Sequence, residues 1–279
     1  MSRLKLLTWN IWMMPRWTRT SPRNEARARA IAQELLARDD DIVCLVKAFD
    51  GGARGVLSDV LGAKYPYRYG PVNASGSPLK INGGVWVLSA RPLSDYQEIQ
   101  FDESTGIESL SRKGAMRLGG RIGDRPFYLV ATHFQGESGP RFQKIRNAQI
   151  GQIARQLVAP VTEGGVPFLF CGDFNTPRRT QNDPLVETPD YLHMLQTLGA
   201  TNGHEDRITL DDNLLHNDLA TDNKGRVAEL DYILLRAGSS FIEGNWERVV
   251  FRRGGWDDEK NRQDLSYRFA VSASFTFPS

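Results

Sequence analysis

One stretch organises this chain: Phe170-Cys171-Gly172-Asp173-Phe174-Asn175, at the end of an apolar run that begins at Val166. The run is typical of a buried β-strand, and Gly172 lets the backbone turn where the strand ends. Asp173 and Asn175 are therefore expected at the rim of a sheet. Such a pair can orient a nucleophile or donate hydrogen bonds to an anionic centre. The alternative is an ordinary Asx turn after a strand.

Apolar patterns on both sides of this stretch predict further strands and helices. The expected strands cover 4–10, 41–46, 83–89, 117–121, 127–134, 230–235, 246–251 and 269–275. The expected helices cover 21–38, 52–61, 140–158 and 191–198, the first with Ser21 as N-cap and Pro22 at the first helical position. Antiparallel strands flanked by amphipathic helices predict an α+β sandwich of two sheets with helices outside. Since no repeat or linker divides the chain, residues 1–279 are expected to form a single domain.

The composition excludes several broad classes of protein. Hydrophobic residues make up 40% of the chain and charged residues 24%, which favours a full core over disorder. A net charge of +2 without a basic stripe gives no nucleic-acid signal, and no apolar run reaches transmembrane length. Cys44 and Cys171 lie in apolar runs, which predicts that both are small core residues. Unpaired core cysteines are typical of a reducing compartment. No signal-peptide pattern precedes the first strand, so a cytoplasmic location is expected.

Short motifs occur in a characteristic order along nearly the whole chain. They include Thr8-Trp9-Asn10-Ile11-Trp12, Asn82-Gly83-Gly84-Val85, Lys113-Gly114, Thr132-His133-Phe134-Gln135, Gly172-Asp173-Phe174-Asn175 and Leu230-Asp231-Tyr232-Ile233-Leu234. Together they resemble the endonuclease/exonuclease/phosphatase superfamily, and within it the bacterial neutral sphingomyelinase branch. The resemblance implies a four-layer α/β/β/α sandwich with its site where the strand ends converge. It also implies a reaction in which Mg²⁺ and a histidine base let water attack a phosphodiester.

Two segments depart from the family pattern. Leu45-Val46-Lys47-Ala48-Phe49-Asp50 has Lys47 where the family has the glutamate that binds the metal, and Ser266-Tyr267-Arg268 replaces the family's aspartate and histidine base. An ammonium about 4 Å from a dication is repelled by roughly 8 kcal/mol at an effective dielectric of about 20. A guanidinium cannot take a proton from water, and losing a positioned base lowers a rate by roughly 10²–10⁴. We therefore expect no metal, no cofactor and no ordinary Mg²⁺-dependent sphingomyelinase activity.

Other polar residues match functional positions of the family. The resemblance makes His133 a donor to a phosphoryl oxygen, with Asp231 as a candidate to orient it. It places Asp173 and Asn175 at the reacting centre. For His133 the alternative is a histidine satisfied at a strand end. The predicted site consists of the catalytic residues Lys47, His133, Asp173, Tyr267 and Arg268 and the substrate-binding residues Asn10, Asn175 and Asp231.

Each of these replacements makes the charge of the predicted site more positive. Lys47 and Arg268 are cations that can hold phosphate or carboxylate groups, the arginine through two parallel hydrogen bonds. Lys47 could also have a lowered pKa and act as a base or an amine nucleophile. Drift after loss of function is the alternative for both segments.

Three functions are consistent with this combination. The favoured hypothesis is a repurposed, metal-independent enzyme that holds an anionic or carbonyl-bearing small molecule on Lys47 and Arg268, while the other predicted catalytic residues move or orient protons. The second is a pseudoenzyme that binds a phosphate-bearing ligand or partner without turnover. The third is a residual Mg²⁺-dependent phosphodiesterase with an alternative site built from Asp173, Asn175 and Asp231.

Overall fold

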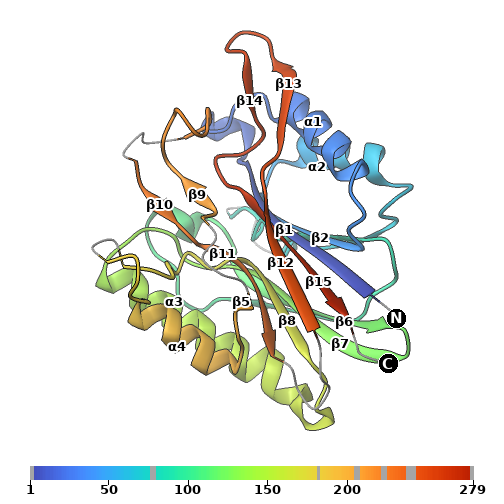
Figure 1. The fold of residues 1–279 in the computed structure, drawn as a ribbon, viewed down its shortest axis with the longest axis vertical. Coiled ribbons are helices and arrows are strands. Elements are labelled where there is room, and N and C mark those ends of the chain that lie inside the picture. The colour runs from blue at the N-terminus through green and yellow to red at the C-terminus, as the bar shows by residue number, and fades with distance from the viewer. Residues whose placement is uncertain are drawn as a thin grey trace.

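Two β-sheets packed face to face form the centre of the computed structural model, which describes residues 3–75, 80–180, 183–203, 208–220, 225–236 and 243–276. Helices cover the outer face of each sheet (Figure 1). The first and last long strands of the chain pair with each other within one sheet. These layers confirm the predicted α+β sandwich and its α/β/β/α order.

The first sheet contains the strand that opens the chain. Its strand order is β12-β15-β1-β2-β4-β3. Their bounds are Glu243–Val249 (β12), Ala270–Thr276 (β15), Arg3–Met13 (β1), Ile42–Ala48 (β2), Trp86–Ser89 (β4) and Tyr67–Tyr69 (β3). β1 is parallel to β2 and antiparallel to β15. Because Asn10 is in register with Val46, the side chains of Asn10 and Lys47 come to the same end of the sheet.

The second sheet contains the organising stretch. Its strand order is β11-β8-β7-β6-β5. Their bounds are Asp231–Arg236 (β11), Phe168–Asp173 (β8), Arg125–His133 (β7), Gly114–Ile122 (β6) and Ser94–Gln100 (β5). Asp173 is in register with His133 on one side and with Asp231 on the other. Three of the predicted site residues therefore lie at neighbouring strand ends.

Helices complete the outer layers. α1 (Asn24–Leu36) and α2 (Gly51–Leu61) pack on the first sheet, and α3 (Pro140–Ile153) and α4 (Pro189–Leu198) pack on the second. Short helical segments are η1 (Arg16–Thr18), η2 (Gly106–Leu110), η3 (Ala154–Val158, a π-helix that continues α3) and η4 (Ala159–Gly164). Cys44 and Cys171 lie in the apolar core between the sheets, as predicted. Within the described ranges, no helix has the length and apolar character needed to cross a membrane.

The predicted start of the first helix is wrong by three residues. α1 begins at Asn24, after Arg23 in a left-handed conformation with φ 41°. Ser21 is not the N-cap, because its hydroxyl accepts a hydrogen bond from the Met14 amide at 3.1 Å and donates to Asn24 Oδ1 at 2.7 Å. The serine thus ties the loop to the end of β1 instead of opening the helix.

Two short hairpins were not predicted from the sequence. One joins β13 (Arg252–Asp257) to β14 (Arg262–Asp264) and projects beside α1, and the other joins β9 (Leu210–Asp211) to β10 (Val227–Ala228) (Figure 1). Of the β13 side chains only Trp256 and Asp257 are buried, so the strand lacks the apolar alternation that marks a strand in sequence.

Gly172 is essential for a reason other than the predicted turn. It lies within β8 with φ 139°, and a Cβ there would lie 1.9 Å from the carbonyl oxygen of Thr132. Glycine therefore allows β7 and β8 to approach closely at the position before Asp173. This contact sets the spacing between Asp173 and His133.

Candidate active site

The predicted site residues meet at one rim of the sandwich. Each lies near the end of a strand or in a loop next to one: Asn10 (β1), Lys47 (β2), His133 (β7), Asp173 (β8), Asn175 (after β8), Asp231 (β11), Tyr267 and Arg268 (before β15). Direct hydrogen bonds or ion pairs join all of them except His133 into one network. The backbone of the 266–268 segment is anchored to β1, because Ser266 donates to the carbonyl of Asn10 at 2.6 Å.

Arg268 lies between two carboxylates. Its Nη1 is 3.0 Å from Asp231 Oδ2, and its Nη2 is 3.3 Å from Asp173 Oδ2. Nη2 also donates to Asn175 Oδ1 at 3.4 Å. Burial alone would lower the pKa of Arg268, but the two carboxylates outweigh it and the pKa is raised. The guanidinium therefore carries a fixed positive charge and forms an ion pair with each of the two acids.

The two carboxylates are fully buried. Asp173 Oδ2 also accepts from Asn10 Nδ2 at 2.8 Å, and Asp173 Oδ1 accepts from the Asn175 amide at 3.0 Å. Burial raises the pKa of Asp231, and the nearby Asp173 raises it further against the opposing effect of Arg268. Two acids this close need a cation between them, and in this chain Arg268 supplies it.

Lys47 is only partly buried, and its ammonium donates to the Tyr267 hydroxyl at 2.7 Å. Burial works to lower the pKa of Lys47, but Tyr267 and Asp173 outweigh it and the pKa is raised. The hypothesis of a lysine with a lowered pKa is therefore wrong. Lys47 is a stable cation and not a base or an amine nucleophile. The backbone of Lys47 is left-handed, with φ 55°, a conformation that residues other than glycine rarely adopt.

Tyr267 connects the two cations. Its hydroxyl oxygen accepts from Lys47 and, at 3.4 Å, from Asn10 Nδ2. The guanidinium carbon of Arg268 is 5.3 Å from the centre of its ring, and the ring of Trp12 meets it edge-on at 5.2 Å. Since the oxygen already accepts these bonds, the phenolic proton remains available to donate.

His133 is buried and stands apart from the acids. Its Nε2 is 3.2 Å from the ammonium of Lys113, and its Nδ1 has no hydrogen-bond partner among the described residues. Asp231 does not orient it as predicted, because the carboxylate of Asp231 pairs with Arg268. Burial lowers the pKa of His133 well below 6.5, and the charges of Lys113 and Lys47 lower it further. The imidazole is therefore neutral.

The buried neutral histidine predicts a pH dependence of stability. Below about pH 6.5 the unfolded chain protonates His133 and the folded protein does not. Stability therefore falls as the pH drops from 6.5 toward the depressed pKa, by up to about 1.4 kcal/mol per pH unit. We expect the free energy of unfolding of His133→Gln, from urea titrations at several pH values across this window, to fall less steeply than that of the wild type. Equal slopes would contradict a neutral His133.

The residues present do not fit a magnesium ion at the family's position. Mg²⁺ requires carboxylate or water oxygens in octahedral geometry. Here the guanidinium of Arg268 already binds the oxygens of Asp173 and Asp231, and the ammonium of Lys47 replaces the carboxylate expected at its position. Arg268 also binds the side-chain oxygens of Asp173, Asn175 and Asp231, which would be the ligands of the alternative metal site.

Two residues with roles at this site were not assigned any from the sequence. Lys113 and Glu108 form an ion pair of 2.7 Å beneath His133, in which the lysine is buried and the glutamate is partly exposed. The motif Lys113-Gly114 pointed to the segment without indicating what the lysine contacts. Glu108 lies in η2 and carries no pattern that could have identified it. Trp12, which belongs to the first motif, contacts the ring of Tyr267.

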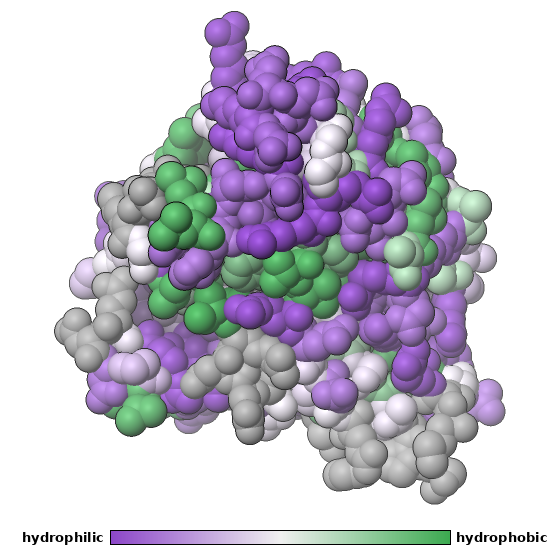
Figure 2. Space-filling view, turned by 45° about the horizontal axis from the view of Figure 1, so that its top comes forward, coloured by the Kyte–Doolittle hydropathy of each residue, from purple (hydrophilic) through white to green (hydrophobic). Residues whose placement is uncertain are grey.

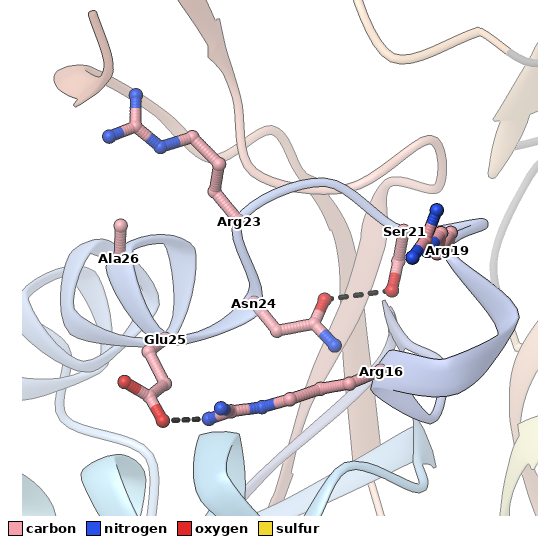
Figure 3. A pocket seen from close by; sticks show the side chains of 7 residues that line it. All are labelled: Arg16, Arg19, Ser21, Arg23, Asn24, Glu25 and Ala26. Carbon is pink, nitrogen blue, oxygen red and sulfur yellow. Dashed lines mark hydrogen bonds and ion pairs between the residues drawn. The ribbon is translucent and has the colours of Figure 1, made fainter.

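A surface depression of about 520 Å³ lies between η1 and the start of α1 (Figure 3). Its lining includes Arg16, Arg19 and Arg23, and Figure 3 shows Arg16 reaching Glu25 while Arg23 extends away from it. Arg23 also lies 3.5 Å from Asp257. Two of the three guanidinium groups are therefore paired with carboxylates.

The face in Figure 2 is mainly hydrophilic, with hydrophobic side chains gathered in its middle.

Comparison with known sequences agrees with this architecture. The model of the Endonuclease/Exonuclease/phosphatase family matches residues 7–248. Sphingomyelinase C 2 of Leptospira interrogans is 27% identical over 220 residues, which are 71% of this chain and 33% of that protein. Phospholipase C of Staphylococcus aureus is 25% identical over 256 residues, covering 82% of this chain and 72% of that protein. The chain thus spans about a third of the length of the Leptospira relative.

Solved structures share the fold over nearly the whole chain. A beta toxin from Staphylococcus aureus has a TM-score of 0.85 at 24% identity, covering 97% of this chain and 99% of that one. A beta toxin mutant from the same organism, solved with bound magnesium ions, has a TM-score of 0.79 at 21% identity, with 98% and 99% covered. The family match and these likenesses agree with the arrangement of sheets and strand ends described above. The chain belongs to the endonuclease/exonuclease/phosphatase family and is similar to its bacterial sphingomyelinases.

Proposed function

We propose that this protein is a metal-independent enzyme that cleaves a small phosphate-bearing molecule, most simply a phosphodiester. Water attacks the phosphorus as the bond to the leaving oxygen breaks; Lys47 binds the anionic group, Tyr267 donates a proton to the leaving oxygen and regains one from the attacking water, and Arg268 replaces the divalent cation as the counter-charge of the buried acids. The similarity to enzymes named sphingomyelinase C and phospholipase C supports a phosphodiester as the substrate class. The substrate and the cleavage are inferred from the site and from these relatives together.

One observation carries this proposal: the 2.7 Å hydrogen bond from the ammonium of Lys47 to the hydroxyl of Tyr267. Lys47 is partly exposed, whereas Arg268 and both acids are buried, so Lys47 is the cation that a ligand reaches first. A charge-assisted donor next to a phenol stabilises the negative charge left when that phenol gives up its proton. Lys47 and Tyr267 therefore supply charge neutralisation and proton donation at one point.

A second candidate function is binding without turnover. It is favoured by the ion pairs of Arg268, which occupy Asp173 and Asp231 and leave neither acid available to activate water. A site without a positioned base is expected to be slower by roughly 10²–10⁴ than one that has it. The two functions differ in one result, the release of product over long incubation.

The test compares Lys47→Ala with the wild type. We expect turnover of a chromogenic phosphodiester, or of sphingomyelin in vesicles, to fall by about 10²–10³ when the donor is removed. The matched control is Lys144→Ala, which removes an exposed lysine of α3. Equal loss in both variants, or none in Lys47→Ala, contradicts the proposed enzyme. Saturable phosphate binding that depends on Lys47, without product, establishes the binding function instead.

Metal dependence is a separate prediction. Because Arg268 already neutralises the acids, we expect neither added Mg²⁺ nor a chelator to change the wild-type rate. The measurement is the initial rate in chelator-treated buffer and in the same buffer with excess Mg²⁺. Activation by Mg²⁺ that the chelator reverses would show that Arg268 moves aside for a metal, and the metal-independent mechanism would then be wrong.

A further inference from the structure

Lys113 is a buried lysine that contacts the imidazole of His133. It directly precedes β6, and its side chain is 2% exposed. Its ammonium donates to Glu108 Oε1 at 2.7 Å and to the carbonyl oxygen of Phe134 at 2.7 Å. The third contact is to His133 Nε2 at 3.2 Å. One acceptor lies in η2 and the other two are consecutive residues at the end of β7, so the lysine ties the start of β6 to these two segments beneath the site.

The hydrogen-bond partners of Lys113 determine the tautomer of His133. An ammonium has three N–H donors and no acceptor. A carboxylate and a backbone carbonyl only accept, so two of the donors point to Glu108 and Phe134. The third faces His133 Nε2, which must then present its lone pair. In the neutral imidazole the proton therefore lies on Nδ1.

The Nδ1–H group is left for a ligand. It is buried, and the part of the chain that the structure describes offers it no acceptor. A buried N–H without an acceptor costs about 1–3 kcal/mol, which an oxygen of a bound ligand recovers. His133 is in register with Asp173, so this donor belongs to the same rim as the network of Arg268.

We infer that Lys113 is a positioning residue, which fixes His133 in the Nδ1–H tautomer so that the imidazole can donate a hydrogen bond to a phosphoryl oxygen. The ion pair with Glu108 keeps the ammonium in place. The tautomer follows from the contacts alone, while the donation to a phosphoryl oxygen rests on the proposed function. Lys113 thus acts on the ligand through His133 and does not touch it.

The first experiment is independent of any activity. Imidazole ¹⁵N NMR of the ligand-free protein distinguishes the two neutral tautomers, and His133→Gln assigns the signal among the four histidines of the chain. We expect the wild type to show Nδ1–H, and Lys113→Met to shift the proton toward Nε2, the tautomer that free histidine favours. Lys113→Arg, which keeps a charged donor, is expected to restore Nδ1–H. An Nε2–H tautomer of His133 in the wild type overturns the inference even if neither Lys113 variant folds.

The second experiment tests the effect on the reaction. We expect Lys113→Met to lower kcat on the chromogenic phosphodiester by about 10²-fold, the loss of one preorganised donor, with partial recovery in Lys113→Arg. A shifted tautomer with unchanged kcat overturns the positioning role. If the wild type has no turnover, the proposed enzyme fails while the tautomer result stands. Inorganic phosphate then serves as the probe, and the role survives only if phosphate shifts the Nδ1–H signal of His133.

Discussion

Replacing Arg268 with alanine is expected to lower the free energy of unfolding by about 3–5 kcal/mol at neutral pH. The variant leaves Asp173 and Asp231 buried side by side without the cation that lies between them. Removing one partner of a buried ion pair is strongly destabilising, because the remaining charge has neither water nor a counter-ion. Urea denaturation followed by circular dichroism at pH 7 measures the loss.

The matched control is Arg253→Ala. Arg253 pairs with Glu34 at 2.8 Å, but the two side chains are 43% and 24% exposed. A pair in contact with water contributes about 0–1 kcal/mol, so this variant should differ little from the wild type. Adding Asp231→Asn to Arg268→Ala should recover part of the lost stability, because a neutral amide then lies beside Asp173 in place of a second buried acid. A loss below about 1 kcal/mol in Arg268→Ala would mean that the acids do not depend on the guanidinium.

Replacing Tyr267 with phenylalanine is expected to lower kcat by about 10²–10⁴, the usual contribution of a positioned proton donor. The substitution removes the hydroxyl but keeps the ring that packs against Trp12. It also leaves the ammonium of Lys47 without its 2.7 Å partner while preserving its charge. We therefore expect KM to change much less than kcat. Steady-state rates on the chromogenic phosphodiester separate the two parameters.

Tyr96→Phe controls for the loss of a tyrosine hydroxyl in general. Tyr96 is 44% exposed, and its hydroxyl donates to Glu98 at 2.5 Å on β5. Its removal should leave kcat and KM unchanged. If Tyr267→Phe retains wild-type kcat while Lys47→Ala loses it, the lysine acts without the phenol. The proposed proton donation would then be wrong.

Lys47 and Arg268 have different partners at the site. Arg268 pairs with the two acids, whereas Lys47 donates to the hydroxyl of Tyr267. One positive charge is therefore buried among the acids, and the other lies at a partly exposed position.

Much of the fold could be predicted from local patterns. The apolar run ending at Asp173 identified β8, and the motif order identified the sandwich and the rim where the site residues lie. These features follow from burial along single segments, which periodicity and glycine positions report. The β13–β14 hairpin was not predicted, because its strands do not alternate apolar and polar residues.

The sequence by itself determined which side chains gather at the rim. Only the tertiary structure decided how those side chains pair. Arg268 is 37 residues from Asp231, and Lys47 is 220 residues from Tyr267, so no local pattern connects them. The same packing decided that the pKa of Lys47 is raised and not lowered. The pKa of a buried group depends on every charge around it, and those charges come together only when the strands of both sheets are in register.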